Sequence, residues 1–168
     1  MCIRDSRIAV VGDSAGGNLA AAVALKARDE HGPRLGLQAL LYPITDCSFD
    51  TASYQECASG FGLTRETMIF YWDCYLARPR DAEHPYASPL RAIDLGGVAP
   101  ALILTAHFDP LRDEGLAYAA KLTEAGVRVE CSDYLDMNHG FVLMGTAYPS
   151  ARQALNELAR AVRSQKAI

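Results

Sequence analysis

A serine between two glycines stands near the start of the chain. It belongs to the pentapeptide Gly12-Asp13-Ser14-Ala15-Gly16, which follows a short β-branched run and precedes an alanine-rich run typical of a helix. A nucleophilic serine on a sharp strand-to-helix turn requires this context, because Gly12 and Gly16 let the strand and the helix approach while the Ser14 hydroxyl projects outward. The pattern favours nucleophilic catalysis by Ser14 over an ordinary glycine-rich turn.

A serine hydroxyl is a weak nucleophile near neutral pH, so it needs a base within hydrogen-bond reach and a further group that orients this base. The sequence offers an acid and a histidine in suitable places. Asp109 follows the apolar run 101–106, and His139 lies in the loop expected after a strand at 127–132. Because ligands of open parallel sheets bind beyond the carboxyl ends of the strands, we expect these side chains to lie at one edge of the sheet together with Ser14.

Both assignments have competitors in the sequence. Asp113 is the alternative acid, but it falls inside the following helix, where it can cap the helix or pair with Arg112, so its position favours Asp109. The alternative histidine is His107, two residues before Asp109 on the same expected strand. The other two histidines fall in turns or loops and are expected to be solvent-exposed: His31 and His84.

Strands and helices alternate along the chain, which predicts an α/β fold with a parallel sheet and helices on its faces. The expected strands are 8–11, 37–42, 101–106 and 127–132, and the expected helices are 15–28, 65–76, 113–125 and 151–162. We expect the first strand to be fully buried and the last to lie at a sheet edge with one wet face. The last helix should cover the sheet with the stripe Ala151, Ala154, Leu155, Leu158 and Val162.

The connections between these elements are long. Residues 45–62 show no periodicity, and residues 79–100 hold four of the eight prolines in an irregular loop of a kind that is often functional. The helix at 65–76 carries an aromatic cluster that is more typical of a core or an interface, with the lining of a pocket as the alternative: Phe70, Tyr71, Trp72 and Tyr75.

Four motifs in this order carry a family resemblance: residues 12–20, Leu41-Tyr42-Pro43, residues 109–115 and His139-Gly140-Phe141. The chain resembles the carboxyl-terminal half of hormone-sensitive-lipase-like α/β-hydrolases, the bacterial carboxylesterases with a Gly-Asp-Ser-Ala-Gly turn. The resemblance implies that Ser14 is the nucleophile, Asp109 the orienting acid and His139 the general base. It also implies that the Ala15 backbone N–H serves the oxyanion hole and that small carboxylic esters are the substrates.

The chain departs from this family in one respect. Members carry a His-Gly-Gly-Gly motif upstream of the serine turn, which supplies the other oxyanion donors, and this sequence has none. We therefore expect residues 1–168 to form a single partial hydrolase domain of about four parallel strands flanked by helices, with residues 1–6 as a non-native leader. Losing an oxyanion donor costs on the order of 10²- to 10³-fold in rate. We expect a poor catalyst. We also expect low solubility, because one edge of the strand at 8–11 lacks the neighbouring strand that family members have there.

Composition narrows the choice of partners, cellular location and cofactors. Half of the 168 residues are hydrophobic, and the net charge of −4 without a basic block gives no reason to expect a nucleic-acid partner. No apolar run is long enough for a membrane span, and we expect a cytoplasmic location without a secretory signal. The five cysteines form no metal-binding pattern: Cys2, Cys47, Cys57, Cys74 and Cys131. We therefore expect free thiols, no metal and no cofactor, although the sequence is also compatible with a single disulfide.

Two further functions fit the same residues. Other acyl transfers, by a peptidase, an amidase or a lactonase, would use the same three side chains. A non-catalytic ligand-binding protein of this fold is the alternative from another class, and the presence of His139 argues against it because such proteins typically lose the histidine.

Overall fold

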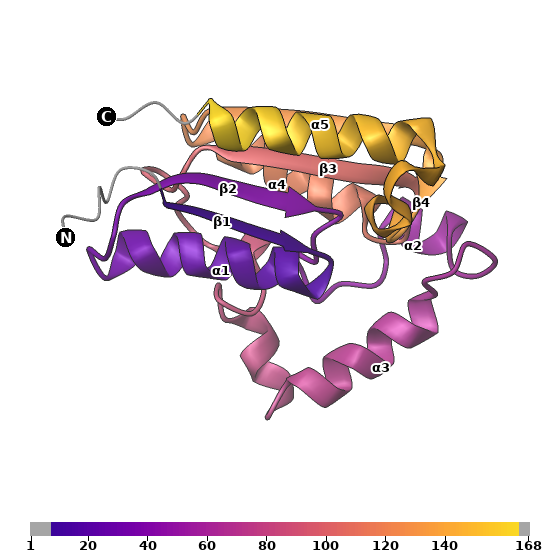
Figure 1. Ribbon diagram of the computed structural model, residues 1–168. Helices are drawn as coiled ribbons and strands as arrows, with labels where there is room; N and C mark the ends of the chain where they lie inside the picture. The colour runs from indigo at the N-terminus through magenta and orange to yellow at the C-terminus, as the bar shows by residue number, and fades with distance from the viewer. Residues whose placement is uncertain (1–7, 165–168) are drawn as a thin grey trace.

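A four-stranded parallel sheet organises the molecule. The computed structural model describes residues 8–164, so the expected leader at 1–6 and Cys2 lie outside the described residues. The strands β1 (Ile8–Asp13), β2 (Leu35–Leu41), β3 (Ala101–Phe108) and β4 (Val129–Asn138) lie side by side in sequence order (Figure 1). The predicted α/β class with about four parallel strands is confirmed.

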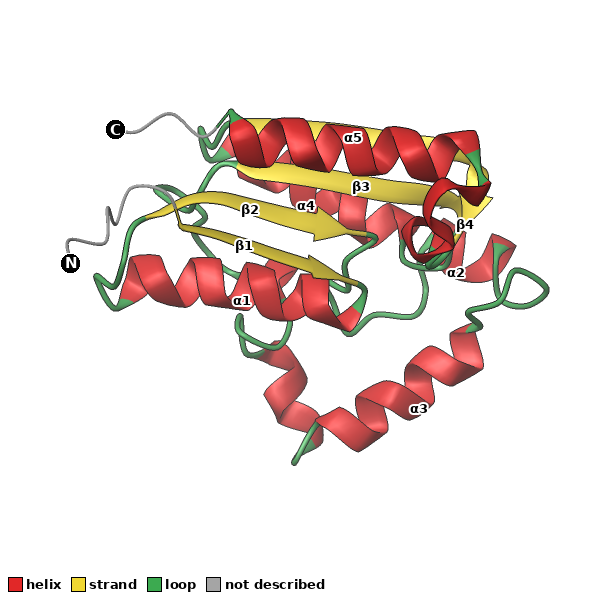
Figure 2. Cartoon of the chain, in the orientation of Figure 1, coloured by secondary structure: helices red, strands yellow, loops and turns green. Residues whose placement is uncertain are grey.

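Helices cover both faces of this sheet (Figure 2). On one face, α1 (Ala15–Asp29) and α4 (Arg112–Glu124) enclose an apolar cluster that includes Leu25, Ile103 and Tyr118. On the other face, α5 (Pro149–Arg163) encloses a second apolar cluster with the 3₁₀ segment η4 (Phe141–Ala147). Each strand therefore contributes alternate side chains to two separate cores.

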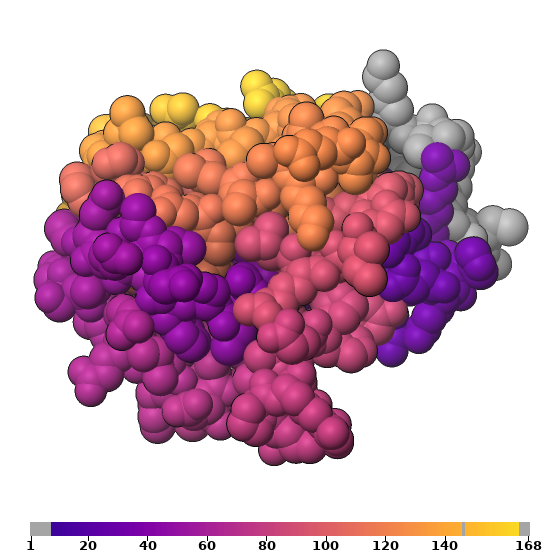
Figure 3. Space-filling view, turned by 180° about the vertical axis from the view of Figure 1, so that it is seen from behind, coloured from indigo at the N-terminus to yellow at the C-terminus, as the bar shows by residue number. Residues whose placement is uncertain are grey.

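The long connection between β2 and β3 forms a third packing unit. It contains α2 (Ala52–Glu56), α3 (Arg65–Tyr75) and the 3₁₀ segments η2 (Pro79–Glu83) and η3 (Pro89–Arg91). The Thr64 side chain accepts a hydrogen bond from the Thr67 amide and begins α3, as an N-cap threonine does. Figure 1 shows α3 to one side of the sheet, and Figure 3 shows this part of the chain as a projection from the rest of the molecule.

Three expectations about single elements were wrong. The first strand is not fully buried, because β1 lies at an edge of the sheet and Val11 is 48% exposed. The last strand does lie at the opposite edge as predicted, but it runs from Val129 to Asn138, beyond the expected range. In α5, Val162 is 41% exposed and Ala161 takes its place in the core.

Candidate active site

Ser14 occupies the turn between β1 and α1. Its backbone has φ 53° and ψ −119°, a conformation that residues other than glycine seldom adopt. The Ser14 amide donates to the Leu41 carbonyl at 2.8 Å, which ties the turn to the end of β2. The strand–turn–helix context predicted from the sequence is therefore present, and it places the serine at the carboxyl edge of the sheet.

The close approach of strand and helix at this turn depends on Gly12. A Cβ on Gly12 would lie 2.0 Å from the carbonyl oxygen of Gly16, so no other residue fits there without a backbone shift. Gly16 was expected to play the same part, but a Cβ on it would meet only the Asp13 carboxylate at 3.7 Å. The second tight position is Gly17, where a Cβ would lie 2.9 Å from Pro43. No local sequence pattern predicts this contact, because Pro43 is distant from Gly17 along the chain.

The three residues singled out in the sequence form one continuous chain of contacts. His139 follows the end of β4, and its Nε2 lies 2.9 Å from the Ser14 Oγ. Its Nδ1 lies 2.6 Å from Oδ2 of Asp109. Asp109 is completely buried, and its other carboxylate oxygen accepts a hydrogen bond from the Leu111 amide at 2.9 Å. The order Ser14, His139, Asp109 is the geometry of a nucleophile, a base and an orienting acid.

The competing acid and histidine make other contacts. The Asp113 carboxylate accepts hydrogen bonds from the Ser53 amide at 2.8 Å and from the Arg112 side chain at 2.9 Å. His107 lies 3.2 Å from the Asp133 carboxylate, and Thr105 donates to that same carboxylate. Asp113 therefore joins α4 to α2, and His107 joins β3 to β4.

Two buried polar side chains form hydrogen bonds with the backbone of the connection between β2 and β3, beside the site. No sequence pattern predicted either of them. The Asn18 side chain, in the first turn of α1, donates to the Ile44 carbonyl at 3.0 Å and to the Ala87 carbonyl at 2.8 Å. The Glu114 carboxylate accepts hydrogen bonds from the Thr45 amide at 2.6 Å and from the Asp46 amide at 3.3 Å. Burial raises the pKa of Glu114 well above its ordinary value, against the lowering effect of these amides.

An apolar cavity of about 570 Å³ opens beside Ser14 and His139. The cavity is lined by α1, the loop after β2, the loop before α3 and α3 itself. Its lining residues besides Ser14 and His139 are Ala15, Asn18, Leu19, Ile44, Leu63, Met68, Tyr71, Trp72 and Tyr75. The aromatic helix therefore serves both of the roles considered for it. Met68 and Trp72 are buried in a core cluster, whereas Tyr71 and Tyr75 are about half exposed along the cavity.

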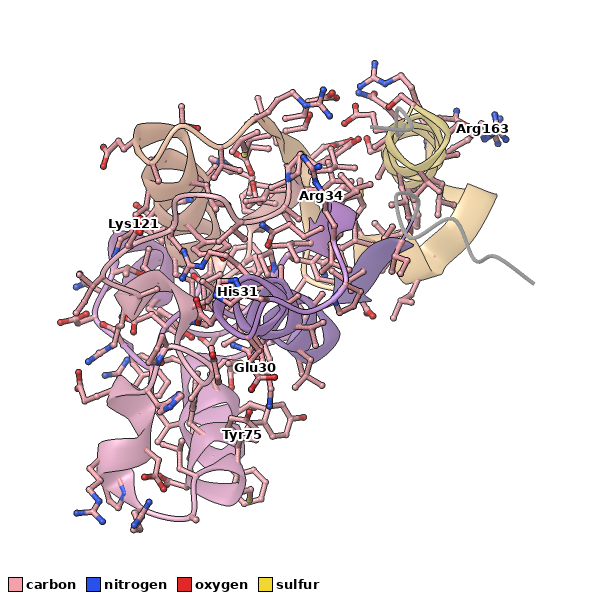
Figure 4. The ribbon with its side chains drawn as sticks, turned by 90° about the vertical axis from the view of Figure 1, so that its left-hand side faces the viewer. Glu30, His31, Arg34, Tyr75, Lys121 and Arg163 are labelled. Carbon is pink, nitrogen blue, oxygen red and sulfur yellow. The ribbon has the colours of Figure 1, made fainter. Side chains whose placement is uncertain are left out.

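A second cavity, of about 660 Å³, lies at the opposite end of the sheet and is lined in part by Arg28, His31, Arg34 and Arg128. Figure 4 is seen from this end and shows His31 and Arg34 in the connection that leaves α1. His31 and His84 are exposed, as predicted. The lining of this cavity contains no member of the Ser14, His139 and Asp109 group, so the chemistry belongs to the smaller cavity.

Comparison with known proteins shows the family to which the chain belongs. A family model of the α/β hydrolase fold matches residues 2–143. The chain is an α/β-hydrolase. Its relatives place it in the hormone-sensitive-lipase-like group that the sequence motifs indicated.

Several relatives of this α/β-hydrolase are named as esterases. The carboxylic ester hydrolase LipN of Mycobacterium tuberculosis is 44% identical over 164 residues, which are 94% of this chain and 43% of that protein. An ethyl acetate hydrolase of Pseudomonas putida is 40% identical over 152 residues, 89% of this chain and 47% of that protein. The crystal structure of the thermophilic carboxylesterase EstE1, from a metagenomic library, superposes with a TM-score of 0.91 at 42% identity over 96% of this chain and 55% of that one.

The α/β-hydrolase chain spans about half the length of the curated relatives it matches. Within residues 8–164, no helix is both long enough and apolar enough to cross a lipid bilayer. The same residues contain no group of three or more His, Cys, Asp or Glu side chains placed to hold a metal ion.

Proposed function

We propose that this chain carries the nucleophile, the base and the orienting acid of a serine carboxylesterase. The observation that supports the proposal is the unbroken series of contacts from Asp109 through His139 to Ser14, which ends at an apolar cavity. A buried carboxylate beside one imidazole nitrogen stabilises the imidazolium that forms when the other nitrogen takes a proton. This arrangement serves acyl transfer.

The reaction would proceed in two halves. The Ser14 Oγ attacks the ester carbonyl carbon while its proton passes to Nε2 of His139, and a tetrahedral oxyanion forms. The intermediate collapses to an acyl-serine as His139 returns the proton to the departing alcohol. Water then attacks the acyl carbon with His139 again as the base, and the carboxylic acid leaves Ser14 free.

The start of α1 would stabilise the oxyanion. Ala15 is the first residue of this helix, so its amide has no carbonyl partner within the helix, and it directly follows the nucleophile. We assign this N–H to the oxyanion hole, where the positive end of the helix adds to its effect.

The cavity favours a small, uncharged ester. The residues that line it include no Lys, Arg, Asp or Glu, and most are apolar or aromatic. A charged acyl or alcohol group would lose its hydration there without gaining a partner. The proposed substrates are therefore neutral esters of small carboxylic acids, in keeping with the ethyl acetate hydrolase among the relatives.

Covalent labelling tests this proposal without a natural substrate. A fluorescent fluorophosphonate is expected to label the wild-type chain on Ser14 and to leave Ser14→Ala unlabelled. The His107→Gln variant, which changes a histidine outside the series of contacts, should be labelled at the wild-type rate. Labelling that survives Ser14→Ala would refute the nucleophile assignment, and loss of labelling in His107→Gln would refute the assignment of the base.

We also propose that the chain forms one structural domain and acts in the cytoplasm. Two apolar clusters share the single sheet, which supports one domain, and the thiols of Cys47, Cys57, Cys74 and Cys131 are free, as in reducing compartments. A single calorimetric unfolding transition would support the first point, and cell fractionation with a tagged chain would test the second.

A further inference from the structure

Two successive residues at the end of β2 connect to all three segments that carry the proposed catalytic residues. The Leu41 carbonyl accepts the Ser14 amide at 2.8 Å, and the Tyr42 amide donates to the Leu104 carbonyl at 2.6 Å on β3, the strand that leads to Asp109. The third connection is through a side chain, because the Tyr42 ring contacts the His139 imidazole.

The Tyr42 ring lies edge-on to the imidazole. The ring centroids are 4.8 Å apart and the planes meet at 62°, an arrangement favoured by the electrostatics of aromatic rings. Phe141 supports the tyrosine ring at 5.7 Å. Burial and the negative charges of Asp13 and Asp109 raise the pKa of the Tyr42 phenol, so the ring beside His139 is neutral.

The backbone of Tyr42 is also unusual. Its φ is 38°, in the left-handed region that bulky residues avoid, and the residue is 1% exposed. Such a conformation persists only where the surrounding structure determines it, and it is found most often at functional sites. Here this conformation turns the main chain away from the direction of β2, and the Tyr42 side chain contacts the imidazole.

We propose that Tyr42 is a positioning residue that fixes the plane of the His139 imidazole; this inference rests on the proposed function. Contacts at Nδ1 and Nε2 define the line between Asp109 and Ser14, but they leave the ring able to tilt about that line. A second ring packed against the imidazole blocks the tilt. Nε2 then stays aligned with the Ser14 hydroxyl for proton transfer.

This role makes a distinctive kinetic prediction. Tyr42 does not belong to the residues that line the cavity beside Ser14, so its ring should not affect binding of the ester. With p-nitrophenyl acetate as the probe, Tyr42→Leu should lower kcat about 10- to 100-fold, the range for a small misplacement of a catalytic group, with KM nearly unchanged. Tyr42→Phe keeps the ring and should retain the wild-type kcat.

Tyr134 offers a matched control. It belongs to the same apolar cluster, is 6% exposed and packs on Phe141 at a centroid distance of 4.9 Å, one ring further from the imidazole. Tyr134→Leu removes an equal ring from the same core and should lower the thermal midpoint about as much as Tyr42→Leu does, while the labelling rate stays at the wild-type value. Should Tyr42→Leu not fold, Tyr42→Met takes its place, because methionine fills the space without an aromatic plane.

Two readouts separate this proposal from the proposed function. The first is the rate of fluorophosphonate labelling of Ser14, expected to fall in Tyr42→Leu and to recover in Tyr42→Phe. The second needs no reaction: the proton on Nδ1 of His139, held against Asp109, should give a far-downfield NMR resonance that Tyr42→Leu broadens or removes. An unlabelled wild type would refute the esterase, and the resonance would still test Tyr42. An unchanged resonance with an unchanged labelling rate in Tyr42→Leu, or equal slowing in Tyr134→Leu, would overturn the positioning role.

Discussion

Gly12 and Gly16 flank the same serine, but the structure gives them different importance. A Cβ on Gly12 would overlap the Gly16 carbonyl, whereas one on Gly16 has ordinary contact distances and lies in a helix, where alanine is preferred to glycine. We expect Gly12→Ala to lower the free energy of unfolding by at least about 3 kcal/mol. Gly16→Ala should raise it by up to about 1 kcal/mol. Urea titrations followed by circular dichroism compare the two, and equal midpoints would contradict this account.

A substitution of Asp109 should affect the rate of the reaction far more than the binding of the ester. Asn at this position can present an amide N–H to Nδ1 of His139 and so favour the wrong tautomer, in which Nε2 carries the proton and cannot accept one from Ser14. Asp109→Asn is expected to reduce kcat about 10³- to 10⁴-fold with little change in KM. The measurement is steady-state hydrolysis of p-nitrophenyl acetate. A loss confined to KM would mean that Asp109 contacts the substrate instead of the base.

The side chains of the proposed triad could be predicted from the sequence because each follows a strand. Ser14, Asp109 and His139 occur in the expected order, and parallel strands bring such positions together. The contacts around them could not be predicted in the same way. Gly17 meets Pro43, and Tyr42 meets His139, through packing between segments that no local pattern links.

At the scale of elements, Glu114 couples α4 to the loop after β2. Its raised pKa means that the folded state favours the protonated carboxyl. The stabilisation of the folded state by the protonated Glu114 side chain is therefore complete at low pH, and it is lost as the pH rises through the raised pKa. Glu114→Gln removes the ionisation and keeps an acceptor for the Thr45 amide. Between about pH 5 and about pH 8, we expect the stability of the wild type to fall relative to that of Glu114→Gln. Urea midpoints across this range test it, and a constant difference would show that Glu114 does not titrate in this way.

Element types were more predictable than element boundaries. α1 and α3 lie within a residue of their expected limits, and the Thr64 cap marks the start of α3. The last strand was expected at 127–132, where apolar and polar residues alternate, yet main-chain pairing with β3 carries β4 to Asn138. The five residues of α2 were missed because a single turn leaves no periodicity to detect.

For the molecule as a whole, the outer edge of β1, which pairs with no other strand among residues 8–164, favours self-association. Edge strands with unpaired main-chain groups and apolar side chains promote association between chains. The wild-type chain is therefore expected to self-associate with increasing concentration, and Val11→Lys, on the edge strand, should reduce this. Val23→Lys introduces the same charge at a valine of similar exposure on α1 and should have a smaller effect. Sedimentation velocity measures both, and a monomeric wild type at every concentration would contradict the expectation.

Overall architecture followed from the alternation of strands and helices, whereas the burial of individual strands did not. Sheet order decides which strands are central, and within the described residues 8–164 only β2 and β3 have a neighbour on each side. The short β-branched run of β1 is compatible with either a central or an edge position, so its hydrophobicity alone led to the wrong expectation of full burial.

The positions of β1 and β4 have a consequence for how activity is lost on heating or in denaturant. Ser14 follows one edge strand and His139 the other, and the contact between them joins residues 125 positions apart. Fraying of either edge would separate nucleophile from base while the pair of central strands stays folded. Labelling of Ser14 should therefore disappear at a lower denaturant concentration than the circular dichroism signal, so that inactivation precedes unfolding. A loss of both signals at one midpoint would show instead that the edges and the centre of the sheet melt as one unit.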